Sequence, residues 1–335
     1  MPEQRVVNIS IADGDILKHD ASVAIFKYAQ GLHGADRVAF NTLTNGGVRV
    51  VLPVQGAYTT METRGVISPP KVVFIGVEPL QNFNYPEIRT FARFALRAVA
   101  DADREATTAS ITLHGPGYGL DEVESFNAEI AGLIDALQAG EAPRRLAHIV
   151  MVEMNRDRAV RLRRLLSQLL PDGNLVISSG GNLRALPKER AEIVRAAGFE
   201  ATNKVHVFVA MPFTKKMEDV FEFGIKTPVN DLGYLCERAD LATFVGDINQ
   251  WVKERIAAAD LIVADLTGAN ANVYLEVGYA WGAGRPTVLV AEAGTELLFD
   301  VRTQRCLIYE SIKDLKAKLT HELQGLERNA GARAG

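Results

Sequence analysis

Apolar residues recur along this chain with either the two-residue period of a strand or the 3.6-residue period of a helix, and the first half contains both patterns. Residues 5–12 (RVVNISIA) alternate with the two-residue period of a strand, and residues 71–77 (KVVFIGV) are apolar enough for a strand buried on both faces. Residues 85–103 repeat apolar side chains at helical spacing on one face. The same criteria predict further strands at 48–54, 110–113 and 146–153 and helices near 121–138 and 156–170.

A second series of strands and helices begins at residue 205. Apolar strands are predicted at residues 205–210, 260–265, 287–291 and 306–309, and helices at 218–232, 248–258, 273–281 and 311–324. Gly224 and Pro228 interrupt the first of these helices. Strands that alternate with helices favour α/β architecture with mainly parallel sheets.

The length of 335 residues suits two domains. The run Pro171-Asp172-Gly173 ends one predicted helix, and the stretch up to Asn203 combines Ser179-Gly180-Gly181 with a short helix predicted near 188–197. We therefore expect two three-layer α/β domains, at residues 1–170 and 204–325. The stretch 171–203 is expected to be a linker, and the polar tail at 326–335 is expected to be loose.

Composition excludes several kinds of protein. A formal net charge of -4 and a pI near 5.9 leave no basic footprint for duplex nucleic acid, although a single nucleotide needs only a few local donors. Two cysteines, Cys236 and Cys306, make neither a disulfide framework nor a metal-ligand spacing, and both fall in apolar stretches typical of a core. Six histidines form no metal-binding motif, so we expect no metal site.

The sequence predicts neither a signal peptide nor a membrane span. The N-terminal residues lack the apolar core of a signal peptide. The longest apolar run, around residues 261–264, is far shorter than the ~20 residues that span a bilayer. We expect a cytoplasmic protein with no membrane partner.

Two strand ends of the second domain carry candidate binding residues. Phe213 follows the strand at 205–210 and could stack on a base or a sugar, while Asp265 ends the strand at 260–265. Ligands of open α/β sheets bind at the carboxyl ends of strands, which favours one shared cleft. A plain βα turn and a turn-forming or capping aspartate are the structural alternatives. The candidates are Met211, Pro212, Phe213, Asp265, Thr267 and Gly268.

Glu276 is the strongest candidate for chemistry. It lies in the first turns of the predicted helix at 273–281, on a face shared with Asn272 and Ala280 at i±4 spacing. Its apolar neighbours would partly desolvate the carboxyl group, which raises its pKa and suits glycosidic chemistry. Most helix glutamates are simply exposed. Asp265, however, ends the strand that leads into this helix, so both carboxyl groups would face one cleft.

The motifs of the second domain occur in a recognisable order. The runs FVAMPF, ADLIVADLTG, ANVYLEVGYAWG and RPTVLVA, with Asp247 between the first two, extend from residue 205 to 291. As a set they resemble the nucleoside 2-deoxyribosyltransferase-like family, which is related in fold to TIR-type NAD-cleaving domains. The resemblance implies a flavodoxin-like domain in which Glu276 is the catalytic glutamate. Asp265 would bind sugar hydroxyls or position Glu276, Asn272 would lie near the ligand, and Asp247 would contact the ligand or cap the next helix.

This resemblance implies cleavage or transfer at the N-glycosidic bond of a nucleoside, a nucleotide or NAD, with no required cofactor. Water as the acceptor gives hydrolysis and a second base gives exchange, and the sequence leaves both open. A homo-oligomer is expected, because a neighbouring subunit often completes such transferase sites.

Two loops of the first domain suggest a nucleotide ligand. Residues 12–16 (ADGDI) and 114–119 (HGPGYG) follow predicted strands, and the backbone N–H groups of glycine-rich loops can approach phosphates. The pair resembles a macro domain or the N-terminal domain of leucine aminopeptidases, and no metal-peptidase half accompanies it. A macro domain implies an ADP-ribose-like ligand, whereas a scaffold with ordinary turns is the alternative. The candidate residues are Asp15, Ile16, Gly115, Gly117, Tyr118 and Gly119.

Three functions follow from these observations. The first is an N-glycosidase regulated by the first domain, an arrangement that resembles bacterial antiphage effectors. The second is a non-catalytic protein that binds nucleotide signals. The third is an interaction scaffold. An enzyme releases free base, a sensor retains intact ligand, and a scaffold gains no thermal stability from any nucleotide.

Overall fold

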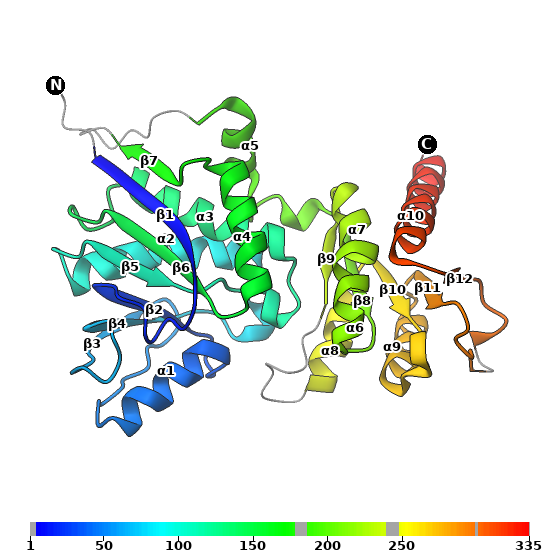
Figure 1. The fold of residues 1–335 in the computed structure, drawn as a ribbon, viewed down its shortest axis with the longest axis horizontal. Helices are drawn as coiled ribbons and strands as arrows, with labels where there is room; N and C mark the ends of the chain where they lie inside the picture. Colours follow the sequence, from blue (N-terminus) through cyan, green and yellow to red (C-terminus); the bar gives the residue numbers. More distant parts are fainter. Residues whose placement is uncertain (1–4, 178–185, 239–247, 299–300, 335) are drawn as a thin grey trace. The chain divides into compact units, whose positions relative to one another are not determined.

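The chain forms two compact α/β units in a computed structural model that describes residues 5–177, 186–238, 248–298 and 301–334. The first unit comprises residues 1–117 and 122–201, and the second comprises 118–121 and 202–335. Both combine a sheet with helices (Figure 1), so the predicted α/β fold class is confirmed.

The described strands of the first unit form one mixed sheet in the order β3-β4-β2-β5-β6-β1-β7. The edge strands β3 and β7 run antiparallel to their neighbours, and the strands between them run parallel. Their carboxyl ends therefore lie at one edge of the sheet. The bounds are β1 Arg5–Asp13, β2 Val23–Tyr28, β3 Tyr58–Glu62, β4 Lys71–Gly76, β5 Thr108–Ile111, β6 His148–Glu153 and β7 Asn174–Ile177.

The helices of this unit are α1 (Gly34–Asn45), α2 (Tyr85–Ala102), α3 (Glu122–Gln138), α4 (Arg156–Leu169) and α5 (Lys188–Ala196). Asn84 caps α2 by accepting the backbone N–H of Glu87 at 3.4 Å. The helices α2 and α3 approach so closely at Gly132 that a Cβ atom there would lie 2.2 Å from the carbonyl oxygen of Arg89. Glycine therefore sets the spacing of this helix pair.

The stretch at 171–203 was expected to be a linker with a short helix; that helix is α5, and together with β7 it belongs to the first unit. The buried guanidinium of Arg89 explains why α5 is held in place. It forms an ion pair with Asp135 at 2.7 Å and donates to three carbonyl oxygens at the end of α5, at 2.8 to 3.0 Å, namely those of Val194, Arg195 and Ala197. These partners are distant in sequence, so local patterns did not reveal them.

The predicted strand at 48–54 is wrong. This stretch is irregular, and the edge strand is β3 instead. Val48, Val50 and Leu52 do pack against the core of this unit, while Val51 and Val54 are 49% and 73% exposed, but the stretch pairs with no described strand. Pro53 also lacks the N–H group that a strand ladder needs.

The second unit is built on a parallel sheet in the order β12-β11-β10-β8-β9. Numbered by sequence within the unit, this is the 2-1-3-4-5 order of flavodoxin-like folds, with its switch point between β8 and β10. The flavodoxin-like parallel sheet expected for this part of the chain is present. The bounds are β8 His206–Ala210, β9 Leu235–Glu237, β10 Leu261–Asp265, β11 Thr287–Glu292 and β12 Cys306–Tyr309.

Helices cover both faces of this sheet, because successive strand residues point to opposite sides. Val207 and Val209 of β8 pack with Leu315 of α10 (Ile312–Ala334) and with the segments after β8. Phe208 and Ala210 pack against α8 (Ile248–Ala258) and α9 (Ala271–Gly282) on the other side. The helix α10 continues through most of the tail that was expected to be loose.

A stretch of π-helix lies within the predicted helix at 218–232. The order is α6 (Lys215–Asp219), the π-helix Val220–Lys226 and α7 (Thr227–Asp231). Pro228 has no N–H to donate to the carbonyl of Gly224. The N–H of Thr227 instead reaches the carbonyl oxygen of Glu222, five residues back. Pro228 thus accounts for the wider turn.

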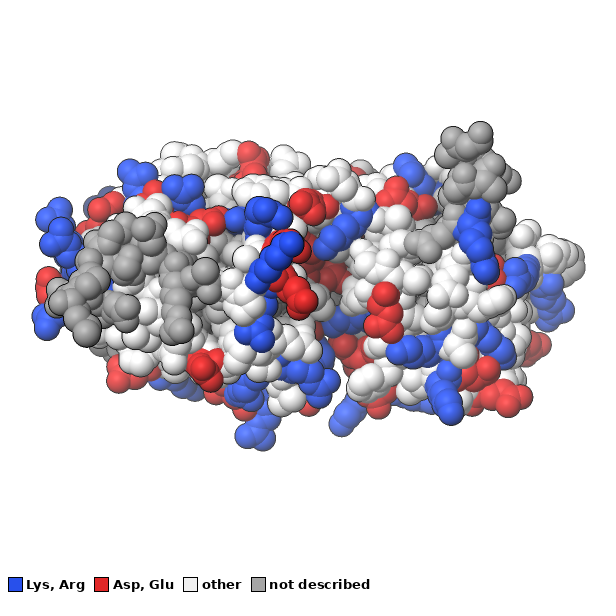
Figure 2. Space-filling model, turned by 90° about the horizontal axis from the view of Figure 1, so that it is seen from above, with Lys and Arg blue, Asp and Glu red and all other residues white. Residues whose placement is uncertain are grey.

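The surface mixes charges of both signs. Figure 2 shows Lys and Arg side chains interspersed with Asp and Glu on one face of the molecule. The described residues of this face therefore offer no broad basic patch to a nucleic-acid duplex. In the part of the chain that the structure describes, every helix is too short or too polar to cross a membrane.

Candidate functional site

The switch point of the second unit brings two predicted segments together. In the register of the parallel pair, Ala210 at the end of β8 lies beside Ala264, one residue before the end of β10. The loop from Met211 to Phe213 and the turn after Asp265 therefore leave the sheet at the same edge. Met211 and Pro212 are buried, whereas Phe213 is 39% exposed and available to a ligand.

Asp265 is fully buried, and both of its oxygens have partners. Oδ1 accepts the backbone N–H of Thr267 at 2.9 Å, and Oδ2 accepts the hydroxyl of Tyr309 at 3.0 Å. Burial raises the pKa of Asp265, while the hydrogen bonds from Thr267 and Tyr309 oppose this rise. This arrangement suits a positioning residue better than one that binds sugar hydroxyls directly.

Thr267 extends the same network. Its hydroxyl lies 3.2 Å from that of Tyr309 and accepts the backbone N–H of Glu292 at 2.9 Å. The ends of β10, β11 and β12 are thereby joined at the edge of the sheet where the candidate site lies. Tyr309 belongs to no sequence motif. The only sequence signal for it is its position at the end of the apolar strand β12.

A sharp turn connects β10 to α9. Gly268 and Ala269 both have positive φ angles, 73° and 49°. This conformation suits glycine, but it is strained for alanine. Asn270 then caps α9 by accepting the backbone N–H of Asn272 at 3.0 Å. The cap leaves the side chain of Asn272 exposed on the first turn of the helix.

Glu276 lies one turn after Asn272 on the same face of α9. Its carboxyl group is half-buried and makes no hydrogen bond or ion pair within the described residues. Burial raises its pKa to about 7. A carboxyl group with this pKa carries a charge in about half of the molecules at neutral pH, which suits either a nucleophile or a general acid.

Glycine leaves another face of α9 open, on the side of the helix away from Glu276. A Cβ atom added to Gly278 or Gly282 of α9 would meet no heavy atom within 4 Å, apart from the chain neighbours and the helix's own backbone. Leu275 and Trp281 on the same helix are 63% and 39% exposed. This face of α9 is therefore apolar and accessible.

The structure adds Arg238, which follows β9 and which no sequence motif indicated. Its guanidinium lies 3.8 Å from the ring centroid of Phe221 and 5.4 Å from that of Phe213. It also forms an ion pair of 3.0 Å with Glu218, which is half exposed. Arg238 thus places a cation beside the aromatic residue of the candidate site. A lone arginine after a short strand gives no sequence signal.

The remaining candidates of this unit add little chemistry. Asp247 lies outside the described residues. Burial raises the pKa of the Cys306 thiol to about 11 and that of Cys236 well above its usual value, so neither is a thiolate at neutral pH. No cluster of potential metal ligands occurs in the described ranges.

The first-unit candidates divide between two environments. Asp15 accepts the backbone N–H of Leu17 at 3.0 Å, as a turn-forming aspartate does, and Ile16 is buried in the core. Gly115 and Gly117 belong to the first unit, whereas Tyr118 and Gly119 group with the second. Tyr118 packs against the apolar cluster around Trp251 there.

The comparisons with protein-family models and with curated proteins give no match for this chain. Among solved structures, it is similar to a CMP N-glycosidase of Clostridium botulinum, with 20% identity over 34% of this chain and 96% of the other and a TM-score of 0.29. It is also similar to an Oceanobacillus iheyensis macrodomain with MES bound, with 13% identity over 50% of this chain and 99% of the other and a TM-score of 0.36.

A mutant of that macrodomain with ADPR is similar at 11% identity, over 50% of this chain and all (100%) of the other, with a TM-score of 0.35. Identities and TM-scores this low carry no argument about function.

Proposed function

We propose that the second unit breaks the N-glycosidic bond of a nucleoside, a nucleotide or NAD, with Glu276 as the catalytic carboxylate. The observation that carries the proposal is the half-buried carboxyl group of Glu276, which has a pKa of about 7 and no partner within the described residues. It follows the switch point of a flavodoxin-like sheet, where open α/β sheets bind ligands.

The chemistry needs few groups. The ionised carboxylate of Glu276 attacks the anomeric carbon as the bond to the base nitrogen breaks. The electron pair of that bond leaves with the base, which takes a proton from water. Water then attacks the glycosyl ester, releases the sugar and restores the carboxylate. Asp265 positions the turn that leads into α9, and Phe213 stacks on the base or the sugar.

Arg238 supports a phosphorylated substrate. Its cation lies beside Phe213 and is only 13% exposed, so little water screens it. Glu218, its partner, is 50% exposed and can move aside for an incoming phosphate. The favoured substrate class is therefore a nucleotide.

The test is incubation of the whole protein with nucleosides, nucleotides and NAD, followed by chromatography for free base. Glu276→Gln keeps the shape and removes the charge, so base release should fall by about 1,000-fold or more. Glu254→Gln, an exposed glutamate of α8, serves as the matched control and should retain full activity. Release that persists in Glu276→Gln would assign the chemistry to another residue.

Two further results are expected if Glu276 is the nucleophile. A 2-deoxy-2-fluoro nucleotide should leave a stable glycosyl ester on the peptide that contains Glu276, detectable by mass spectrometry. The value of kcat/KM should rise as pH increases through about 7 and then level off, because attack requires the ionised form. A fall above pH 7 would instead make Glu276 the general acid.

Binding without turnover is the second candidate function. Phe213 and Arg238 provide stacking and an anion contact that need no catalysis. Intact nucleotide recovered from a stabilised complex, with no base released, would favour this candidate.

The cellular role and the assembly of the protein are part of the same proposal. By fold-level analogy, an N-glycosidase with an α/β companion domain suits a bacterial antiphage effector. Phage challenge of cells that express the wild type or Glu276→Gln tests this role, and only the wild type should protect. The exposed Leu275 and Trp281 of α9 fit a homo-oligomer, which light scattering measures directly.

A further inference from the structure

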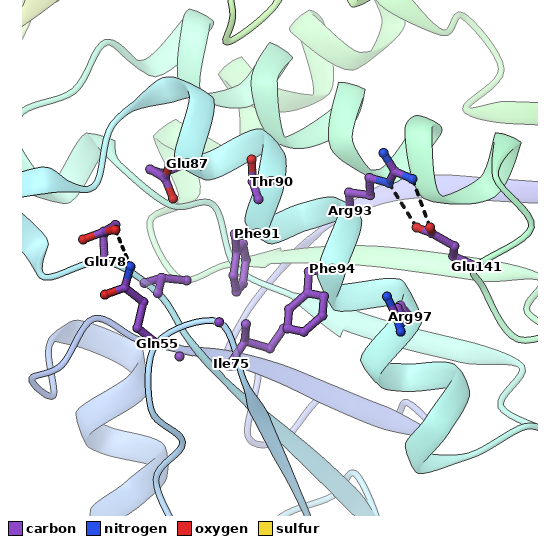
Figure 3. Close-up of a pocket in the computed structure, with 13 residues that line it drawn as sticks. Gln55, Ile75, Glu78, Glu87, Thr90, Phe91, Arg93, Phe94, Arg97 and Glu141 are labelled. Atoms are coloured by element: carbon purple, nitrogen blue, oxygen red, sulfur yellow. Dashed lines mark hydrogen bonds and ion pairs between the residues drawn. The ribbon is translucent and has the colours of Figure 1, made fainter.

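The first unit contains a cavity that the sequence motifs do not reach. Its volume is about 390 Å³, within the range of small-molecule sites. It lies along α2, between this helix, the end of β4 and the loop at Gln55 and Gly56 (Figure 3). We call it the Phe91 cavity. The predicted loops at 12–16 and 114–119 are not part of its lining.

Two aromatic rings form the middle of the Phe91 cavity, and other rings hold them in place. Phe91 packs edge-to-face on His114, with 4.5 Å between ring centroids, and Phe94 packs in the same way on Tyr58 at 5.4 Å. His114 in turn contacts the fully buried Glu129 at 3.2 Å. The apolar surface is therefore formed before any ligand arrives.

The loop that closes the Phe91 cavity is also fixed. Backbone hydrogen bonds of 2.9 Å join Gly56 to Gly76 and Gly76 to Ala57. A Cβ atom on Gly76 would lie 2.0 Å from the carbonyl oxygen of Val54, so only glycine allows this approach. Gln55 is held at the rim, where its side-chain amide donates to Glu78.

Charge is separated along the Phe91 cavity. Figure 3 shows Glu78 and Glu87 to one side of the aromatic rings, and Arg93, Arg97 and Glu141 to the other. Arg93 forms an ion pair with Glu141 at 3.0 Å. Within the described residues, Arg97 makes no ion pair or hydrogen bond and Glu87 has no cationic partner. An anion can therefore bind Arg97, and N–H donors can bind the two glutamates.

The distance between the charged ends limits the occupant. Glu87, Phe91, Phe94 and Arg97 lie on one face of α2 at helical spacing. From Glu87 to Arg97 the helix rises about 15 Å. The ammonium and carboxylate groups of a free amino acid are attached to the same carbon, so they cannot reach Glu87 and Arg97 together. A flat ring that bears an amino group, joined through a sugar to a phosphate, can.

We infer that the Phe91 cavity binds a nucleoside monophosphate whose base carries an exocyclic amino group. The base stacks on the partly exposed ring of Phe94, which the buried Phe91 backs, and donates its amino N–H groups to Glu78 and Glu87, while the phosphate binds Arg97. This site is separate from Glu276 and does not rest on the proposed glycosidase activity.

The location of the nucleotide-binding site is tested first, by photolabelling with 8-azido-AMP. The whole protein carrying Glu276→Gln is used, so that the probe is not consumed. Peptides that contain Phe91 or Gln55 should carry the label, and excess AMP should suppress it. Labelling confined to peptides of residues 202–335 would overturn the inference.

Recognition is tested next, by calorimetry with AMP, IMP and adenosine in the same background. IMP lacks the amino group and adenosine lacks the phosphate, so both should bind about tenfold more weakly than AMP. Arg97→Gln should weaken AMP binding about tenfold and leave adenosine binding unchanged. Glu87→Gln should reduce the preference for AMP over IMP.

Arg104→Gln is the matched control, since Arg104 is exposed just beyond the end of α2. It should leave all three dissociation constants within about twofold of those of its parent. Equal weakening by Arg104→Gln and Arg97→Gln, or no effect of Arg97→Gln, would overturn the inference. Base release from the second unit is a separate measurement, so the two proposals fail independently.

Discussion

The hydroxyl of Tyr309 donates a hydrogen bond of 3.0 Å to the fully buried carboxylate of Asp265, 44 residues away in sequence. Thr267 lies within 3.2 Å of the same hydroxyl. The pair links β12 to β10 across the intervening strand β11. Asp265 therefore holds its geometry through the sheet as well as through its own turn.

Tyr309→Phe should destabilise the protein by about 1–3 kcal/mol, because it leaves a buried carboxylate with one donor fewer. It should also raise the pKa of Asp265 further, since the lost hydrogen bond lowers that pKa. Urea unfolding measures the first effect. Tyr279→Phe is the control, because no hydrogen bond of the Tyr279 hydroxyl occurs within the described residues, and it should be nearly neutral. An equal loss of stability in both variants would contradict a stabilising hydrogen bond from Tyr309 to Asp265.

Stability should depend on pH through Glu276. Its pKa in the folded protein, about 7, is above the usual value of 4.5, so between these values the folded state retains a proton that the unfolded state has released. The stabilisation is thus fully present below about pH 4.5 and is lost as pH rises through 7. Glu276→Gln cannot ionise, so its stability relative to wild type should increase by roughly 2 kcal/mol between pH 4.5 and 7.5. The urea midpoints of both proteins at both pH values test this. An equal change of stability with pH in wild type and Glu276→Gln would contradict it.

Arg238→Gln should separate nucleotides from nucleosides. Loss of a charge-assisted contact should raise KM for a phosphorylated substrate about tenfold, with little change for the matching nucleoside. Arg305→Gln removes an exposed arginine of the same unit and should change neither value. A uniform fall in activity on both substrates would point to misfolding around Phe213 and Phe221 instead of a lost phosphate contact.

Two glycine-to-alanine changes should shift the free energy of unfolding in opposite directions. Gly132→Ala places a methyl group 2.2 Å from the carbonyl oxygen of Arg89, so it should destabilise the first unit by about 1–3 kcal/mol. Gly325→Ala lies in α10, where a Cβ meets nothing within 4 Å beyond its own helix, and should stabilise the second unit by about 0.5–1 kcal/mol. Thermal unfolding compares them, and a stabilising Gly132→Ala would refute the close approach of α2 and α3.

Local pattern predicted the strand ends that carry the candidate site. The apolar runs before Met211 and through Asp265 are β8 and β10, and Glu276 lies in the helix that follows. Strand and helix periodicity is a property of neighbouring residues, so a single sequence shows it. The same rule failed at residues 48–54, where Val48, Val50 and Leu52 pack against the core but the irregular backbone pairs with no described strand.

The sequence by itself determined the α/β class, the two series of strands and helices, and the placement of Asp265 and Glu276 on consecutive elements. Only the tertiary structure decided that Tyr309 contacts Asp265, that Arg238 lies beside Phe213, and that α2 carries a cavity with separated charges. The reason is physical. Strand order and helix packing bring together residues that are far apart in sequence, and burial, which sets the pKa of Glu276, exists only after that packing has formed.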